Sequence, residues 1–160
     1  MFLELNNFNK FFIYDTIYLN LNGVILVNQF LKLFTASAIV FLIFDLFWLL
    51  VVSKKLYQAF IGELLGDVKI TPAIIFYFIY VIGVVFFVLI PGIDRQSIFY
   101  TIFSGALFGL ISYSTYDLTN LATIKNWPVA MTIIDLIWGT SITAVTSAIV
   151  YFINFNFLKG

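Results

Sequence analysis

The chain has 160 residues and a formal net charge of zero; 62% of its residues are hydrophobic and only 10% are charged. Soluble domains average about 45–50% apolar and about 25% charged residues, so this chain has too few charges for a surface that faces water. It contains no cysteine and no histidine, which excludes disulfides, thiolate nucleophiles, the usual zinc sites and histidine-based acid–base chemistry. The zero net charge gives no reason to expect a nucleic-acid partner, and we expect no metal and no cofactor.

Four apolar segments are long enough to cross a membrane. A helix needs about 20 apolar residues to span the hydrocarbon core of about 30 Å. The segments cover about residues 31–52, 74–90, 98–118 and 129–152. The second is closed by Pro91-Gly92, through which a helix does not easily continue. The fourth opens with Asn126-Trp127-Pro128, in which Asn caps a helix, Trp suits the headgroup level and Pro is tolerated in the first turn.

The predicted fold is all-α: a four-helix transmembrane bundle with short loops, formed by residues 31–155. Short loops force consecutive helices to be antiparallel neighbours. Between the first two spans, apolar residues recur at helical spacing and predict a short interfacial helix: Leu56, Ala59, Phe60 and Leu64. In residues 1–30, Asn and Asp interrupt every apolar run. We interpret this part as an N-terminal tail, either disordered or lying at the membrane interface.

Three acidic residues, Asp45, Asp117 and Asp135, fall within the predicted spans. A charged carboxylate at a helix centre costs about 2.5–3.5 kcal/mol on insertion scales, so such residues need a reason. Asp45 lies seven residues before the end of the first span, and Asp135 lies seven residues after Pro128. At about 1.5 Å per residue, both lie about 10 Å inside the same membrane face, and Asp117 belongs to that face too. The three carboxyl groups are therefore expected to converge in one leaflet.

Small and aromatic residues accompany these acids. In the third span, Gly105, Gly109, Tyr113 and Asp117 recur every four residues, so a close-packing glycine face and an acid share one stripe. The first and fourth spans share the short motif Asp-Leu-apolar-Trp, as Asp45-Leu46-Phe47-Trp48 and Asp135-Leu136-Ile137-Trp138. The predicted helix-packing residues are Gly105 and Gly109, and the candidate polar site within the membrane consists of Asp45, Trp48, Tyr113, Tyr116, Asp117, Asn120, Asp135 and Trp138.

Two interpretations of the aspartates stay open. In the functional one, they relay protons, bind a cation or act as acid and base. In the structural one, each forms hydrogen bonds across the bundle, worth about 0.6 kcal/mol per contact on average. Three acids in one leaflet exceed what the structural interpretation requires.

The sequence leaves three functions open and assigns no catalytic residue; it favours a non-enzymatic role without deciding it. The first function is binding or handling of a lipid or other amphiphile at the acidic and aromatic site. The second is a proton- or cation-coupled transport element; transport sites usually lie near the midplane, and no polar stripe is expected to span both leaflets. The third is a non-catalytic subunit that assembles, as a homo-oligomer or with a membrane partner, through its glycine face.

The run Tyr116-Asp117-Leu118-Thr119-Asn120-Leu121-Ala122-Thr123-Ile124-Lys125-Asn126-Trp127-Pro128, followed by Asp135-Leu136-Ile137-Trp138-Gly139, is distinctive. It resembles the hallmark of an uncharacterised bacterial membrane family, domain-of-unknown-function family 2177. The resemblance covers about residues 35–153, and includes Asp45-Leu46-Phe47-Trp48 and Tyr57 through Gly66. It implies a small four-helix protein of the bacterial inner (plasma) membrane and implies no activity. The first thirty residues depart from the family pattern.

Overall fold

The computed structural model describes residues 2–158, without the side chains of residues 2–22, 24, 25 and 63. The chain divides into two units, Met1–Lys32 and Leu33–Gly160, which we describe separately. The described residues form helices and connecting loops. Four helical segments are long and apolar enough to cross a membrane: Leu26–Ile61, Ile70–Asp94, Ile98–Thr123 and Val129–Leu158. The predicted all-α class with four membrane-spanning helices is therefore confirmed.

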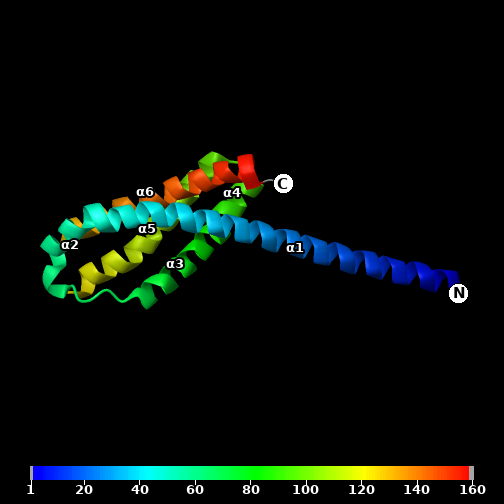
Figure 1. Ribbon diagram of the computed structural model, residues 1–160, viewed down its shortest axis with the longest axis horizontal. Helices are drawn as coiled ribbons and strands as arrows, with labels where there is room; N and C mark the ends of the chain where they lie inside the picture. The colour runs from blue at the N-terminus through cyan, green and yellow to red at the C-terminus, as the bar shows by residue number, and fades with distance from the viewer. Residues whose placement is uncertain (1, 159–160) are drawn as a thin grey trace. The chain divides into compact units, whose positions relative to one another are not determined.

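The first unit has a helical backbone, because α1 extends over Phe2–Phe47 and begins within it. The interpretation of residues 1–30 as a tail that is disordered or interfacial stays a prediction. The remainder of α1, from Leu33 onward, belongs to the second unit, which contains the other helices (Figure 1).

The first span continues beyond α1 through a π-helical turn, η1 (Trp48–Val52), into α2 (Ser53–Ile61) and the short η2 (Gly62–Leu64). The helix expected between the spans is therefore an extension of the first span. In the part of the first span that belongs to the second unit, buried residues are spaced four or eight positions apart: Leu33, Ser37, Phe41, Asp45, Ser53 and Ile61. Side chains four residues apart point about 40° away from each other around the axis of an α-helix, so a row at this spacing gradually turns away from its starting face. The extra residue of a π turn rotates the following side chains back by about 100°. The turn therefore returns α2 to the face that carries Asp45.

The sequence predicts that the second span ends at Ile90, but in the structure the helix continues beyond this residue to Asp94. It begins with α3 (Ile70–Val84), passes through the π turn η3 (Val85–Leu89) and continues as α4 (Ile90–Asp94), with Pro91 in the first turn of α4. Proline lacks an N–H and its ring clashes with the carbonyl four residues earlier in a regular helix. The wider turn just before Pro91 changes the hydrogen-bond register, so the chain accommodates proline without ending the helix.

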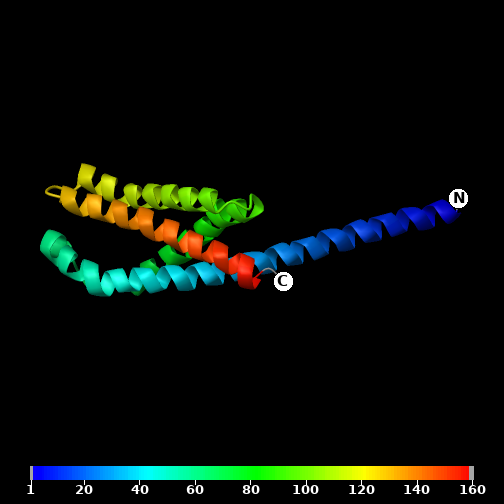
Figure 2. The same cartoon turned by 90° about the horizontal axis from the view of Figure 1, so that it is seen from above.

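The third span is α5 (Ile98–Thr123), and the fourth is α6 (Val129–Ile153), followed by the π turn η4 (Asn154–Leu158). Figure 2 shows α5 and α6 side by side, and the two helices are in contact. Glycines allow the close approach. A Cβ on Gly105 would lie 2.8 Å from Ser147 Oγ, and one on Gly109 would collide with the Gly139 carbonyl and with Thr143 Oγ1. Glycine is therefore required at Gly109, where the obstacle is backbone, whereas a Cβ at Gly105 would require the Ser147 side chain to shift.

The α5–α6 contacts follow a single antiparallel register. Gly105 faces Ser147, Gly109 faces Thr143, and the Tyr113 ring occupies the place where a Cβ on Gly139 would be. Each step of four along α5 is matched by a step of four back along α6. The next step pairs Asp117 with Asp135, so the register alone brings two of the three aspartates to the same level.

A cluster of buried apolar residues, Ile61, Trp127 and Met131, holds α2 against the start of α6, with Tyr57, Phe60 and Leu121 packed around it. Trp127 is only 7% exposed, and its indole N–H donates to Thr132 Oγ1 at 3.1 Å. The sequence interpretation of Trp127 as a headgroup-level residue that opens the span is therefore incomplete, because its side chain is part of the core that positions α2.

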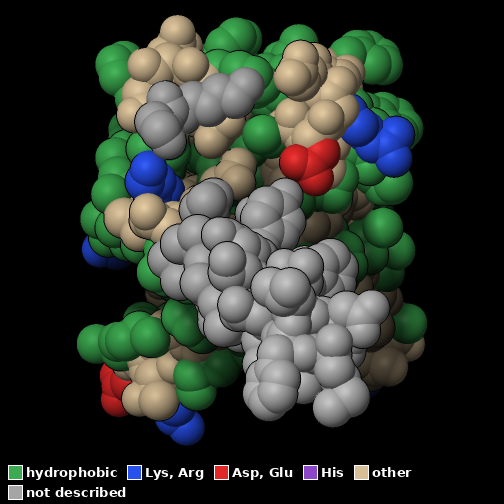
Figure 3. All heavy atoms as spheres, turned by 90° about the vertical axis from the view of Figure 1, so that its right-hand side faces the viewer, with side chains coloured by type: hydrophobic (Ala, Val, Ile, Leu, Met, Phe, Trp, Pro, Cys, Tyr) green, Lys and Arg blue, Asp and Glu red, His purple; other side chains and the backbone are tan. Residues whose placement is uncertain are grey.

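The second unit is apolar outside and unusually polar inside. Eleven of the buried described side chains are polar or charged, against fifteen hydrophobic ones, while many large hydrophobic side chains are exposed, Phe87 and Phe99 among them. In Figure 3, hydrophobic side chains are the most widespread of the coloured groups, with isolated charges between them. Lipid is the solvent that this distribution suits, because an apolar surface needs no polar cover there.

Candidate functional site

Asp45 is buried on α1, 5% exposed, and its carboxylate accepts a hydrogen bond from Tyr77 on α3. The donor–acceptor distance, Tyr77 Oη to Asp45 Oδ2, is 2.5 Å. The Phe41 and Tyr77 rings meet in an edge-type contact with centroids 6.2 Å apart. The carboxylate is thus fixed between the first two spans.

Asp135 of α6 and Asp117 of α5 form an acidic pair. Tyr57 of α2 donates its hydroxyl to Asp135, with distances of 3.1 Å to Oδ1 and 3.3 Å to Oδ2. Asp117 is 1% exposed, lies close enough to Asp135 to interact electrostatically, and its Oδ1 has no hydrogen-bond partner among the described residues. A buried polar atom without a hydrogen-bond partner costs free energy, so the unpartnered oxygen of Asp117 lowers the stability of this core.

A cavity of about 640 Å³ lies beside Asp45 and is bounded by side chains from every span of the second unit. Its size falls within the range of about 300–1,000 Å³ that is common for small-molecule sites. Six aromatic rings, the Asp45 carboxyl group and three small hydroxyls contribute to the wall. The lining residues are Asp45, Leu49, Tyr57, Phe76, Tyr77, Ser112, Tyr113, Thr115, Tyr116, Thr119 and Trp138.

Two indoles stack next to the cavity, and one of them, Trp138, is part of its wall. The rings of Trp48 and Trp138 have centroids 4.3 Å apart and planes inclined by 10°. Neither indole N–H meets an acceptor in hydrogen-bond geometry among the described residues, although Trp138 lies close enough to Asp45 to interact with it. The two Asp-Leu-apolar-Trp motifs of the sequence therefore contact each other through their tryptophans.

The predicted site residues divide into three groups. Asp45, Tyr113, Tyr116 and Trp138 line the cavity, and Trp48 reaches it through Trp138. Asp117 and Asp135 face each other nearby but are not among the described lining residues. Asn120 interacts with Tyr116, one turn away on α5.

Sequence reasoning missed two tyrosines that organise the carboxylates. Tyr57 enters the sequence analysis only through the family resemblance. It lies twelve residues after Asp45, and a regular helix would place it on another face. The π turn η1 brings it back. Tyr77 is a single hydroxyl in an otherwise apolar stretch, which was a usable signal: a tyrosine in the middle of a span needs a polar partner.

One expectation is wrong in a way that bears on function. The sequence predicts no polar stripe through both leaflets, yet one buried face of α6 and η4 carries polar side chains near both of its ends: Thr132 and Asp135 near one end, and Thr143, Thr146, Ser147 and Asn154 towards the other. At 1.5 Å per residue, these positions cover about 33 Å, close to the thickness of the hydrocarbon core. Threonine and serine are common in membrane helices, so the sequence alone does not indicate that these residues share one buried face.

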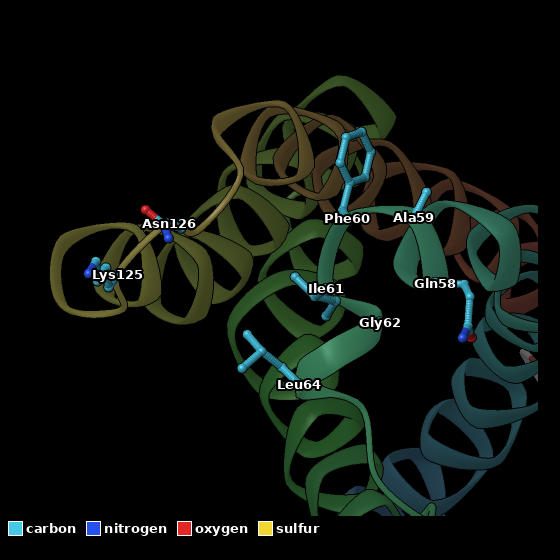
Figure 4. A pocket seen from close by; sticks show the side chains of 8 residues that line it. All are labelled: Gln58, Ala59, Phe60, Ile61, Gly62, Leu64, Lys125 and Asn126. Atoms are coloured by element: carbon cyan, nitrogen blue, oxygen red, sulfur yellow. The ribbon is translucent and has the colours of Figure 1, made fainter.

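A second hollow of about 610 Å³ lies between the end of α2 and the α5–α6 loop. The side chains around it point in different directions: Phe60 and Ala59 to one side, Gln58 to the other, and Lys125 away along the loop (Figure 4). Polar groups do not converge on a common point there. Nor do His, Cys, Asp and Glu side chains of the described residues form any group of three or more that could hold a metal ion.

The fold and the distribution of polar groups define a multi-pass helical membrane protein with a polar, aromatic interior. The family model for predicted membrane proteins of domain-of-unknown-function family 2177 matches residues 30–152, and the chain belongs to this family. No curated protein and no solved structure matches the chain.

Proposed function

We propose that this protein binds an amphiphile, with the polar head beside Asp45 and the chain along the apolar part of the cavity wall. The observation that carries the proposal is the cavity itself: one fixed carboxyl group at a wall that is otherwise mainly aromatic. Ligand sites commonly combine a largely apolar lining with a few placed polar groups. The family resemblance supports a place in the bacterial inner membrane, which we include in the proposal.

The tyrosines favour a fixed site over a loose gap between helices. Tyr113 is held where Gly139 leaves room for its ring, and Tyr77 is held by its bond to Asp45. Preorganised walls lower the ordering cost of binding, so a ligand gains more from each contact.

A cavity-filling substitution tests this proposal without altering the acids. Ser112→Phe places a ring in the cavity, and Ser141→Phe places the same ring on an exposed position of α6 as a matched control. Each protein is equilibrated with a total bacterial lipid extract, released from mild detergent and weighed by native mass spectrometry. We expect an amphiphile adduct on the wild type and on Ser141→Phe and its loss from Ser112→Phe. Equal adducts on all three proteins would contradict the proposal.

Transport of protons or a cation is a second candidate, and the polar face of α6 favours it. This face reaches from Thr132 to Asn154 and includes groups without a hydrogen-bond partner among the described residues, such as Ser147 Oγ. Asp117 of α5, which faces Asp135 near one end of this face, would carry the proton or cation, because its Oδ1 has no hydrogen-bond partner among the described residues. The test is flux of protons or monovalent cations into proteoliposomes: this candidate predicts flux that Asp117→Asn abolishes, and wild-type flux equal to that of empty liposomes contradicts it.

The third function, assembly through the glycine face, has less support. Gly105 and Gly109 pack against α6 of the same chain, so that face is already occupied. A non-catalytic assembly role would need another surface, and an enzymatic role would need a catalytic residue; we propose neither.

A further inference from the structure

We propose that the head of the bound amphiphile is a protonated amine without a phosphate. This inference rests on the proposed function, since it concerns the ligand of the same cavity. It follows from the hydrogen-bonding capacity that the cavity wall leaves free and from the charges of its lining residues.

Five of the seven hydroxyls in the described lining donate to a carboxylate or to a backbone carbonyl, while the indole N–H of Trp138, close to Asp45, meets no acceptor among the described residues. Tyr77 donates to Asp45 and Tyr57 donates to Asp135. The small hydroxyls on α5 donate to their own helix backbone: Ser112 to the Phe108 carbonyl at 2.8 Å, Thr115 to that of Ile111 at 2.8 Å, and Thr119 to that of Thr115 at 2.5 Å. What these groups still offer is their acceptor capacity. A head that donates hydrogen bonds suits these hydroxyls and the Asp45 carboxylate, whereas a phosphate or carboxylate head brings only acceptors, and the Trp138 N–H that could serve it lies beside Asp45, where an anion is repelled.

The charges point in the same direction. Among the described residues that line the cavity, none is a lysine or an arginine, and one is an aspartate. A buried carboxylate is costly unless it is paired, and an ammonium group would pair it. A phosphate head beside Asp45 would instead repel the carboxylate with no cation in the wall to offset the repulsion.

The rings provide the rest of a cation site. Six of the eleven lining residues are aromatic: Tyr57, Phe76, Tyr77, Tyr113, Tyr116 and Trp138. Aromatic faces attract cations, and cages of such rings recognise ammonium groups. A carboxylate and several rings around one cavity thus select a positively charged head on an apolar chain.

The test compares single-chain amphiphiles that differ only in the head. The full-length protein is reconstituted in phosphatidylcholine nanodiscs, and binding of radiolabelled dodecylamine is measured by scintillation proximity, with empty nanodiscs subtracted. Unlabelled dodecylamine, dodecanol, dodecanoate and dodecylphosphocholine then compete. We expect saturable binding that dodecylamine displaces at least tenfold more effectively than the other three compounds.

Two aspartate variants refine the test. Asp45→Asn keeps the shape and an acceptor for Tyr77 but removes the charge, and we expect at least a tenfold loss of dodecylamine affinity. Asp94→Asn, at an exposed position of α4, should bind as the wild type does. Helical content by circular dichroism shows whether each variant is folded, and the competition series on the wild type does not depend on any variant.

The outcomes separate the two proposals. If dodecanol competes as well as dodecylamine, or if folded Asp45→Asn binds dodecylamine like the wild type, the amine inference is overturned while the cavity remains a binding site. If phosphocholine competes equally, the exclusion of phosphate is wrong. If no labelled dodecylamine binds saturably and the lipid adduct of the wild type is also absent, both the inference and the proposed function fail.

Discussion

Replacing Tyr57 with phenylalanine removes one hydroxyl and keeps the ring. That hydroxyl is the donor at 3.1 Å and 3.3 Å from the two oxygens of Asp135, a residue only 4% exposed. A buried acceptor left without its partner costs about 1–3 kcal/mol. Hydrogen bonds between helices in membranes average nearer 0.6 kcal/mol, with a maximum of about 1.7. Because Asp135 lies beside a second aspartate, we expect a value near the upper end of the membrane range, about 1.5 kcal/mol, which is about a tenfold change in the folding equilibrium.

The assay is unfolding in mixed micelles with increasing dodecyl sulfate, followed by circular dichroism. Tyr100→Phe is the matched control: its ring lies under the Arg95 guanidinium at 4.4 Å, a contact that phenylalanine keeps. We expect Tyr57→Phe to lower the free energy of unfolding by about 1.5 kcal/mol and Tyr100→Phe to change it by less than about 0.5 kcal/mol. If the two variants unfold together, α2 does not hold Asp135 as the structure describes, and the reasoning is refuted.

Two further substitutions test the packing and capping of α5 by the same unfolding assay. Gly109→Ala places a methyl group against the Gly139 carbonyl and should destabilise the protein by about 1–3 kcal/mol. Gly62→Ala is the control and should be nearly neutral, because its Cβ would meet only the Gln58 side chain at 3.7 Å. Equal effects of the two substitutions would contradict the α5–α6 register. Ser97→Ala removes the side-chain oxygen that accepts from Tyr100 N at 3.2 Å and should cost about 1 kcal/mol, while Ser97→Asp should retain most of the stability; equal losses would show that the cap contributes nothing.

The number and class of the helices could be predicted because they depend on summed hydrophobicity. A span of about 20 apolar residues is visible without knowledge of any contact. The ends were less predictable. Pro91 is a helix breaker only while the hydrogen-bond register is regular, and the π turn before it depends on tertiary packing that no local pattern reveals.

The candidate site was predictable in its acids and less so in their partners. Asp45, Asp117 and Asp135 stand out because charge is expensive in a membrane, and antiparallel helices place them at related depths. Tyr57 and Tyr77 carry hydroxyls that become informative only when their distance to a carboxylate is known. The register of α5 against α6 similarly depends on which glycines meet which carbonyls, a question of shape and not of composition.

The structure also separates what the sequence grouped together. Asp45 belongs to the cavity with Tyr77 and Trp138, whereas Asp117 and Asp135 form a pair in the α5–α6 contact. The sequence predicts a common depth for the three aspartates and a helix face for each, but it does not predict how the three helices are rotated relative to one another. The direction in which each aspartate points from its own helix decides which of them line the same cavity.

Photolabelling tests the central claim, an occupied cavity, most directly. A dodecylamine that carries a diazirine in its chain is irradiated with the protein in nanodiscs, and the labelled residues are mapped by peptide mass spectrometry. The account predicts labels concentrated on cavity residues such as Leu49, Tyr113 and Tyr116, and their loss when excess unlabelled dodecylamine competes. Labels spread over exposed residues such as Phe86 and Phe99, unaffected by the competitor, would contradict it.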